Sequence, residues 1–292
     1  MLLSEQVTIL IPTKNRANDL QASLARMRDS GYGELPFVIY DDGSADPEAT
    51  RQATECLKNV TVVYGEKSRG QAYGRNCLLE QCRTPFALLT DDDTFFLSSP
   101  DVLAELIARD LYFSGIGRAD AVCAQVVRSY DRVLLFPGLE GTRQIVSPVG
   151  MGLLVRTDVM RKLKGFRDFF VYRHEESELG LRLWAYSHIV VATTEIFLEH
   201  VHTPAGRSSK QYDYLTSRNL MLMHFLDLPG IHGLPTGVLR AMRLFFRLHV
   251  HYFSLLQGFV SGLIGCWRYR GERSVMSLKR YRELVEFRRK LQ

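Results

Sequence analysis

The chain has 292 residues, of which 46% are hydrophobic, so it can bury the core of one large domain or two small ones. Its net charge of +5 is modest for this length and gives no reason to expect nucleic acid as a partner. Five scattered cysteines without a Cys-X-X-Cys pair indicate free thiols in a reducing cytoplasm, and residues 1–16 lack the basic start and the cleavage site of a signal peptide.

The first part of the chain alternates between strand and helix patterns. Val7–Pro12 is a β-branched apolar run, whereas Leu20, Leu24 and Met27 recur at the spacing of one helix face. The same reasoning predicts strands at 7–12, 37–40, 60–64 and 86–90, and helices at 16–30, from Asp46-Pro47, and at 70–82. This alternation predicts an α/β fold with a mostly parallel sheet flanked by helices, in which ligands bind beyond the carboxyl ends of the strands.

The second half of the chain is less regular. Strands are predicted at 121–127, 149–156 and 189–194, and helices at 157–163 and from near Glu176. From Thr236 onward the sequence predicts a helical extension that is rich in aromatic residues and arginine.

Three consecutive carboxylates, Asp91-Asp92-Asp93, directly follow a predicted buried strand. Adjacent acids repel one another, so an unpaired cluster is electrostatically costly. A divalent cation would remove that cost, and oxygen ligands suit Mg²⁺ or Mn²⁺, which also bind phosphate oxygens. The alternative is a solvated acidic turn, which the buried strand and the acids at neighbouring strand ends disfavour.

Polar residues also end two other predicted strands. Asp41-Asp42-Gly43-Ser44 is a turn signal by itself, but a carboxylate at this edge can accept the N3–H of uracil or hold a ribose hydroxyl. Thr13 offers a hydroxyl to the same pocket, and Arg75-Asn76 can reach phosphate or sugar unless it forms a salt bridge on a surface helix. The chain has neither a P-loop nor a GxGxxG after its first strand, so a kinase-like ATPase and a dinucleotide enzyme are not indicated.

Taken together and in order, these segments resemble the motifs of non-processive family-two glycosyltransferases. The resemblance spans about residues 5 to 225 and rests on the segments 7–16, 40–46, 70–76, 89–93, 165–170, 174–179, 199–202 and 214–219. It implies a GT-A fold, with a catalytic domain over 1–230 whose nucleotide-binding half covers about 1–125 and whose acceptor half covers about 126–230. Residues 231–292 would form a helical, basic and aromatic C-terminal segment.

The resemblance also implies roles for individual residues. The donor site would comprise Pro12, Thr13, Asn15, Arg16, Asp41, Asp42, Arg75, Asp91 and Asp92, with Thr13 and Asp42 on the base and Arg75 near the diphosphate. Asp91 and Asp93 would be the outer acids of a DxD-type motif. Asp93 is the favoured ligand of a Mn²⁺ or Mg²⁺ cofactor, and either His200 or His202 would complete the metal site.

The position of the general base carries a departure from the family. The usual Glu-Asp pair is Glu175-Glu176 here, and Glu176 is the favoured base because it occupies the aspartate position. Glu175 remains an alternative, and so does a structural role in which these acids merely stabilise a helix N-terminus. The QxxRW motif of processive synthases is absent, which favours a single transfer.

We therefore expect an enzyme that moves a sugar from a nucleotide-diphosphate sugar to an acceptor hydroxyl, with inversion at the anomeric carbon. Uridine is the first choice of nucleoside, and surface polysaccharide or glycolipid synthesis is the expected context. The alternatives are a sugar-phosphate nucleotidyltransferase and an inactive glycosyltransferase-like binding subunit.

The C-terminal segment has two interpretations. The apolar stretch 252–267 is shorter than the ~20 residues that a spanning helix needs. Its aromatic residues and basic flanks fit a helix in the membrane interface, at the inner face of the membrane, where a lipid-linked acceptor would be found. The other interpretation is a helix packed on the catalytic domain with a solvated basic face.

Overall fold

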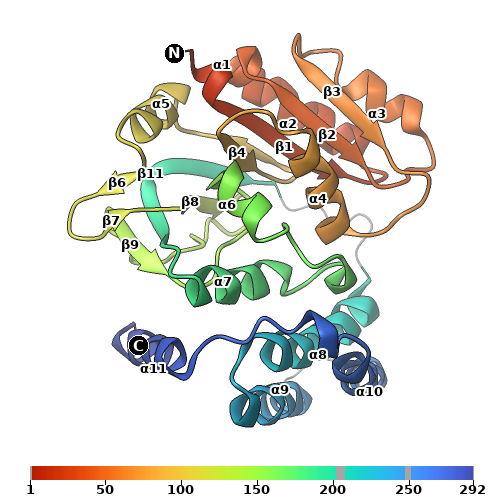
Figure 1. The fold of residues 1–292 in the computed structure, drawn as a ribbon. Coiled ribbons are helices and arrows are strands. Elements are labelled where there is room, and N and C mark those ends of the chain that lie inside the picture. Colours follow the sequence, from red (N-terminus) through yellow and green to blue (C-terminus); the bar gives the residue numbers. More distant parts are fainter. Residues whose placement is uncertain (1, 202–207, 247–250, 292) are drawn as a thin grey trace. The chain divides into compact units, whose positions relative to one another are not determined.

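The computed structural model describes residues 2–201, 208–246 and 251–291 (Figure 1). The chain forms two compact units. The first comprises Met1–Val171 and Ile189–Ala205, and the second comprises Tyr172–His188 and Gly206–Gln292. The predicted division into a catalytic domain at 1–230 and a helical C-terminal segment at 231–292 stays a prediction.

The first unit contains a nine-stranded sheet with the order β3-β2-β1-β4-β10-β8-β11-β5, and β9 pairs with β11. The four strands that begin the sheet, β3, β2, β1 and β4, are parallel, whereas β10 runs antiparallel to both β4 and β8. The strands are β1 Val7–Thr13, β2 Phe37–Asp41, β3 Val60–Tyr64, β4 Phe86–Leu89, β5 Thr94–Phe96, β8 Ala121–Arg128, β9 Thr142–Ile145, β10 Leu153–Arg156 and β11 Val190–His200. A separate two-stranded ladder pairs β6 Tyr112–Phe113 with β7 Gly117–Arg118.

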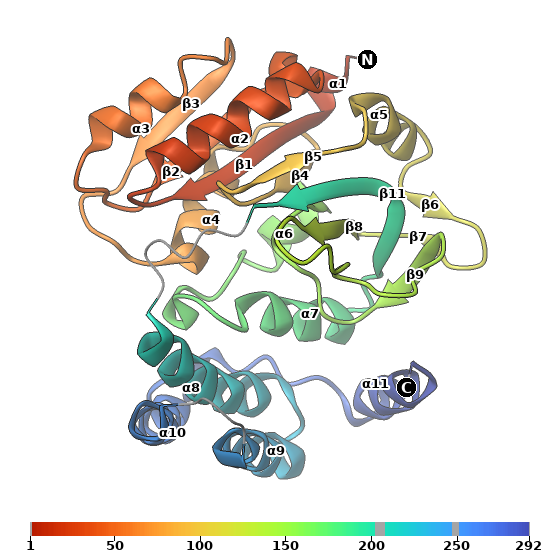
Figure 2. The ribbon, with the colours of Figure 1, turned by 180° about the vertical axis from the view of Figure 1, so that it is seen from behind.

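Helices cover both faces of this sheet, as Figures 1 and 2 show: α2 and α3 lie on one face, and α4 and α6 lie on the other. The apolar stripe of α2, formed by Leu20, Leu24 and Met27, is fully buried against the sheet. The helices of this unit are α1 Leu3–Gln6, α2 Ala17–Asp29, α3 Pro47–Ala53, α4 Gln71–Gln81, α5 Pro100–Ala108 and α6 Thr157–Lys162, with 3₁₀ turns at Tyr32–Glu34 and Asp168–Phe170. The predicted α/β class, with helices on both faces, is confirmed.

Two predicted strands have different bounds in the structure. The strand predicted at 149–156 begins only at Leu153, because Gly152 turns the chain with a φ of +74°. The strand predicted at 189–194 continues to His200, since an irregularity between Thr193 and Phe197 lets β11 pair with β8 on both sides of it.

The second unit is helical. It contains α7 Glu175–Ala185, α8 Ser209–Asp227, α9 Gly230–Arg243, α10 Tyr252–Arg268 and α11 Leu278–Lys290, with 3₁₀ turns at Leu244–Phe246 and Arg270–Glu272. Both α9 and α10 pack against α8 (Figures 1 and 2). Three glycines of α10 allow this close approach, because a Cβ at Gly258 would lie 2.2 Å from the Tyr214 carbonyl oxygen. The prediction of helix from Thr236 onward was incomplete, since α8 and the first turns of α9 precede that residue.

None of the described helices is long and apolar enough to cross a bilayer.

Candidate active site

The carboxyl ends of β1, β2 and β4 bring the predicted polar residues to one edge of the sheet. Thr13 pairs with Asp41 in the parallel register of β1 and β2, and the Asp42 amide donates to the Thr13 carbonyl at 2.9 Å. The Thr13 hydroxyl donates to Asp92 Oδ2 at 2.7 Å. Parallel pairing of neighbouring strands therefore brings residues from three chain segments together, with Thr13 bonded to Asp42 through the backbone and to Asp92 through its side chain.

Arg16, just before α2, pairs with two acids of the triplet. Its Nη1 lies 2.9 Å from Asp92 and its Nη2 lies 2.7 Å from Asp93, while Nε contacts Asp19 at 3.0 Å. The chain thus offsets with its own arginine much of the repulsion that the sequence attributed to the acidic triplet. Such a pre-formed ion-pair network fixes the orientation of carboxylates before any ligand arrives.

The two buried acids differ in their protonation behaviour. Burial raises the pKa of Asp92 to about 7, against the opposing attraction of Arg16. Burial acts in the same direction on Asp93, but its contacts with His200 and Arg16 outweigh that effect and lower its pKa to about 2. Asp93 is therefore held as a carboxylate, the form that binds a metal ion.

His200 reaches the triplet because β11 extends past its irregularity and pairs with β5. In this antiparallel pairing His200 lies opposite Thr94, and the Val201 amide donates to the Asp93 carbonyl at 2.8 Å. The imidazole Nε2 lies 3.2 Å from Asp93 Oδ1, and both side chains are buried. The sequence left the choice between His200 and His202 open; the structure brings His200 to Asp93, and His202 lies outside the described residues.

The Asp93–His200 pair fits two ligands of one divalent ion. Two octahedral ligands at ~2.1 Å from Mg²⁺ or Mn²⁺ are about 3.0 Å apart, close to the 3.2 Å observed. Within the described parts of the chain, no group of three or more His, Cys, Asp or Glu side chains is arranged to hold a metal. Mg²⁺ usually takes one or two protein ligands and completes its shell with water and substrate phosphates, so a pair of side chains is enough to hold it.

Asp91 points to α4 instead. Its Oδ1 accepts from Gln71 Nε2 at 2.9 Å and lies 3.2 Å from Arg75 Nη2. Arg75 is fully buried. The ion pair of the alternative interpretation therefore exists, but the prediction that it lies on the surface is wrong. The guanidinium of Arg75 passes directly over Gly150, where a Cβ would lie 2.0 Å from Nη2.

The Asp41-Asp42 pair organises two loops. Asp41 accepts from the Ser44 amide at 2.7 Å and from the Thr50 hydroxyl at 2.6 Å. Asp42 accepts from the Ser68 hydroxyl at 2.6 Å and from the amides of Arg69 and Gly70 at 2.7 and 2.9 Å. A carboxylate offers about four lone-pair sites, so Asp42 retains room for one further donor and Asp41 for two.

Two other predicted donor residues lie in and after β1. Pro12 pairs in register with Tyr40. Asn15 adopts a left-handed φ of 54°, which asparagine tolerates better than most residues. Its amide donates to the Ser44 hydroxyl at 2.7 Å and its side-chain oxygen accepts from the Ala45 amide at 2.8 Å, so it joins the loops after β1 and β2.

The candidate bases Glu175 and Glu176 begin α7 in the second unit. The preceding Arg173 and His174 both have left-handed φ values, and Asn219 Nδ2 donates to the carbonyls of Tyr172 and Arg173 at 2.9 and 2.7 Å. Glu175 is buried, whereas Glu176 is partly exposed. The accessibility of Glu176 agrees with its choice as the favoured base, a role that stays a prediction.

Sequence reasoning missed how the second half of the glycine-flanked motif is used. Asn76 Nδ2 donates to the Phe166 carbonyl at 2.7 Å and to Asp168 at 2.5 Å, and its side-chain oxygen accepts from the Phe166 amide at 2.8 Å. Asn76 therefore anchors the loop at 165–168. The segments 70–76 and 165–170 both belong to the resemblance to the family, but no local pattern in the sequence links them to one another.

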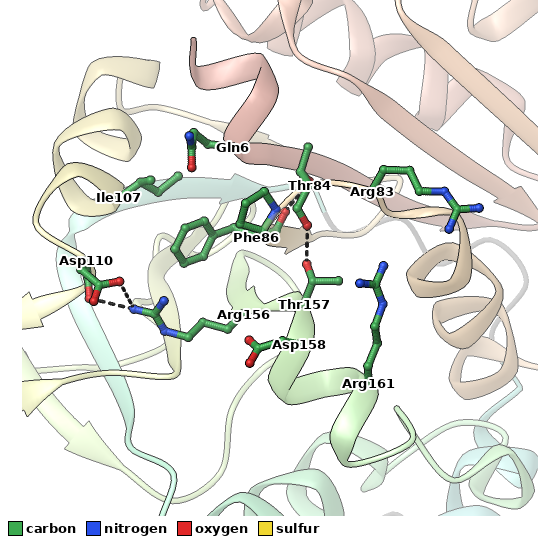
Figure 3. A pocket seen from close by; sticks show the side chains of 11 residues that line it. Gln6, Arg83, Thr84, Phe86, Ile107, Asp110, Arg156, Thr157, Asp158 and Arg161 are labelled. Carbon is green, nitrogen blue, oxygen red and sulfur yellow. Dashed lines mark hydrogen bonds and ion pairs between the residues drawn. The ribbon is translucent and has the colours of Figure 1, made fainter. Parts of the chain in front are cut away.

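A pocket of about 480 Å³ lies at the other end of the sheet (Figure 3). Gln6 before β1, Phe86 at the start of β4 and Arg156 at the end of β10 line it, whereas the acidic triplet follows the carboxyl end of β4. Arg156 pairs there with Asp110 at 2.6 Å, as Figure 3 shows. This pocket is separate from the candidate active site.

Residues 8–170 match the model of glycosyl transferase family 2, which is more than half of the chain. The chain therefore belongs to this family, and the predicted family, enzyme class and GT-A fold are confirmed. A segment of 87 residues is 31% identical to a pre-mycofactocin glycosyltransferase of Mycobacterium tuberculosis. That segment covers 30% of this chain and only 17% of the relative.

Two solved structures share the fold. One is the mannosyltransferase PcManGT from Pyrobaculum calidifontis in complex with GDP-Man and Mn²⁺, with a TM-score of 0.55 and 14% identity over 96% of this chain and 79% of that one. The other is S. aureus TarS in complex with UDP, with a TM-score of 0.53 and 14% identity over 88% of this chain and 70% of that one.

Proposed function

We propose that this protein transfers a sugar from a nucleotide-diphosphate sugar, with UDP-sugars as the first candidates, to an acceptor hydroxyl. The observation that carries the proposal is the Asp93–His200 pair at the carboxyl edge of the sheet in a chain of glycosyl transferase family 2. The similar structures were solved with GDP-Man and Mn²⁺ and with UDP, which are ligands of the proposed class.

The donor would lie along the ends of β1, β2 and β4. Thr13 and Asp42 are the proposed contacts of the base, and the lone-pair site left on Asp42 is enough for one uracil N3–H. Pro12, Asn15 and Asp41 shape the same loops. Arg16 carries a permanent positive charge next to Asp92 and Asp93, so it would also face the diphosphate.

Asp93 and His200 would hold the divalent cation, with Asp91 and Asp92 in supporting positions. A bound cation supplies positive charge that stabilises the departing nucleoside diphosphate. Glu176 would accept the proton of the acceptor hydroxyl as its oxygen attacks the anomeric carbon, and a single displacement of this kind inverts that carbon. Glu175 is the second candidate for this role.

Thermal unfolding with UDP and Mn²⁺, separately and together, tests the donor and metal assignments. A ligand at a hundredfold excess over its dissociation constant adds ~2.7 kcal/mol to the free energy of unfolding, so we expect the pair to stabilise the chain more than either component alone. In the variant Asp93→Asn the additional stabilisation by Mn²⁺ should disappear. In the control variant Glu66→Gln, which changes an exposed residue, this stabilisation should persist. Equal responses of the native chain and Asp93→Asn would refute the metal site.

The same purified protein separates the rival activities. Release of nucleoside diphosphate from a nucleotide sugar upon addition of acceptor supports the transferase. Release of pyrophosphate from a nucleoside triphosphate and a sugar phosphate would support a nucleotidyltransferase instead, and donor binding without any turnover would support a binding subunit.

We further propose that the second unit rests on an anionic membrane surface, where a lipid-linked acceptor would be found. On α10, Phe253, Leu256, Val260, Ile264 and Trp267 follow one another at helical spacing and are all exposed. Residues 231–292 hold twelve basic and three acidic residues, hence a net charge of +9. An apolar stripe beside basic residues is typical of helices that lie in the membrane interface.

Vesicle flotation tests this placement. The full chain should float with vesicles that contain anionic lipid and should float less with neutral vesicles or at high salt. The variant Phe253→Ser/Trp267→Ser removes two exposed apolar side chains and should weaken flotation, whereas Tyr112→Ser, an exposed aromatic position in the first unit, should not. Flotation that is unchanged in both variants would count against the α10 stripe.

A further inference from the structure

A cavity of about 230 Å³ lies within the second unit, between α9 and α11. Leu284 and Val285 of α11 form part of an apolar wall, and the buried His224 of α8 contributes to the lining. The ring of Tyr281, which also lines the cavity, stacks on His232 of α9 with centroids 4.7 Å apart. This stacking joins α11 to α9 beside the cavity.

Three arginines line the same cavity: the exposed Arg240 on α9, and the half-buried Arg288 and the exposed Arg289 on α11. No acidic residue lines it, and among the residues that the structure describes none of these arginines has a carboxylate partner. Burial lowers the pKa of Arg288, and the positive charge of Arg240 lowers it further. The cavity therefore gathers like charges that the described part of the chain does not offset.

His224 adds no positive charge at neutral pH. Its Nδ1 lies 2.6 Å from the Leu220 carbonyl oxygen, and burial, with smaller contributions from Arg240 and Arg288, lowers its pKa to about 4. The positive character of the cavity thus comes from the arginines alone. Arginine keeps its charge at all physiological pH values and presents a planar set of donors that matches phosphate oxygens.

A structural role explains this arrangement less well. Arginine stems often cover apolar surface while the guanidinium reaches water or an acid. Here Arg288 is half-buried and lies near enough to the exposed Arg240 for that charge to lower its pKa, so partial desolvation and like charge both raise the free energy of the folded chain. An anion in the cavity would reverse both effects.

We propose that this cavity is a binding site for a phosphate group, with Arg240 and Arg288 as its principal ligands. The apolar wall formed by Leu284 and Val285 favours a phosphate ester that carries an apolar substituent. A free inorganic phosphate and a lipid phosphate headgroup share the recognised chemistry. The site lies within the second unit and does not depend on the transferase reaction, so it can be present whether or not the donor assignment is correct.

Two double variants of equal charge test the proposal. Arg240→Gln/Arg288→Gln removes the ligands, and Arg243→Gln/Lys290→Gln removes two exposed charges from the same two helices outside the cavity. Unfolding temperatures are measured in sodium phosphate and in sodium chloride of equal ionic strength, so general screening of charge is the same in both. A second series titrates short-chain phosphatidic acid below its micellar concentration.

We expect phosphate to raise the unfolding temperature of the native chain and of Arg243→Gln/Lys290→Gln, and to leave Arg240→Gln/Arg288→Gln unchanged. Loss of charged hydrogen bonds should weaken the apparent affinity for phosphate at least about tenfold. In chloride, Arg240→Gln/Arg288→Gln should be at least as stable as the native chain, because it removes like-charge repulsion. If this double variant does not fold, the single variant Arg289→Gln, which changes an exposed side chain, is measured instead. We then expect a smaller loss of affinity for phosphate.

The two sources of phosphate give different results. Response to phosphatidic acid at a much lower concentration than to inorganic phosphate supports a lipid headgroup, and equal responses support a free phosphate. An equal shift in both double variants, or no shift in the native chain with either ligand, overturns the proposal.

Discussion

The two units of the chain differ in how far their charged side chains are paired with opposite charges. In the first unit, each acid of the triplet contacts a cation or a donor of the same unit, with Arg16, Arg75 and His200 as partners. In the second unit, residues 231–292 include twelve basic and only three acidic residues. The cavity that Arg240, Arg288 and Arg289 line has no acidic residue among its lining residues. The first unit thus holds a pre-organised charge network, whereas the charges of the second unit favour an external anion.

The largest effect should come from Glu176, the acid of the second unit that is the favoured general base. Glu176→Gln keeps the size of the side chain but removes its ability to accept a proton, so the transfer rate should fall about a hundred- to ten-thousandfold. Donor binding, followed by stabilisation with UDP and Mn²⁺, should persist because the proposed donor residues are in the first unit. Glu286→Gln, at an exposed position on α11, is the control, and a larger loss in Glu175→Gln would move the base to Glu175.

One buried pair shows that the second unit can also compensate its charges. On α7, Glu178 is fully buried and forms two hydrogen bonds with Arg182, at 2.6 and 2.9 Å. Glu178→Gln would leave a buried arginine without this carboxylate and should lower the free energy of unfolding by about 3–5 kcal/mol. Urea unfolding measures this. The variant Glu178→Gln/Arg182→Met should recover part of the loss, and failure to recover any would indicate that packing of Arg182 dominates.

Much of the fold could be predicted from the sequence where burial follows a simple period. The strands β1–β4 and the helix α2 have apolar residues at regular spacing, and their bounds agree to within a few residues. The helix α8 was not predicted because it is buried nearly all round: apolar Leu215 and Met221 alternate with buried polar Asn219 and Asp227, which leaves no clear stripe. The short strands β5 and β9 depend on pairing with the distant β11.

The residues of the candidate site also differ in how far the sequence alone could place them. Strand-end residues such as Thr13 and Asp92 could be placed together because parallel strands end at one edge of a sheet. His200 could not be separated from His202 by sequence, since its position depends on the irregularity in β11 and on pairing with β5. The ion pairs of Arg16 depend on burial and side-chain direction, which no local pattern encodes.

The buried His224 should make the free energy of unfolding depend on pH. Burial lowers the pKa of His224 to about 4 in the folded chain, whereas a histidine in the unfolded chain has a pKa near 6.5. The contribution of neutral His224 to the free energy of unfolding is therefore fully present above pH 6.5 and is lost as the pH falls to 4. The expected loss is up to about 3 kcal/mol. Urea unfolding of the native chain and of His224→Asn between pH 7 and 4.5 should show the steeper decline in the native chain. Parallel curves would contradict the buried neutral state.

The compensated network of the first unit is most directly disturbed at Gly150. A Cβ there would lie 2.0 Å from Arg75 Nη2, so Gly150→Ala must displace the guanidinium that pairs with Asp91. Overpacking of this kind should lower the free energy of unfolding by about 1–3 kcal/mol. Gly230→Ala is the control, because nothing lies within 4 Å of its Cβ position and alanine favours the helix that begins there.

A second substitution distinguishes the clash with Arg75 from other effects of the new methyl group. In Gly150→Ala/Arg75→Lys the slimmer ammonium group can avoid the added Cβ, so part of the lost stability should return even though lysine cannot reproduce the guanidinium contacts. Urea unfolding of the single and double variants measures the coupling between the two positions. Strict additivity of the two losses would mean that the guanidinium of Arg75 does not constrain position 150.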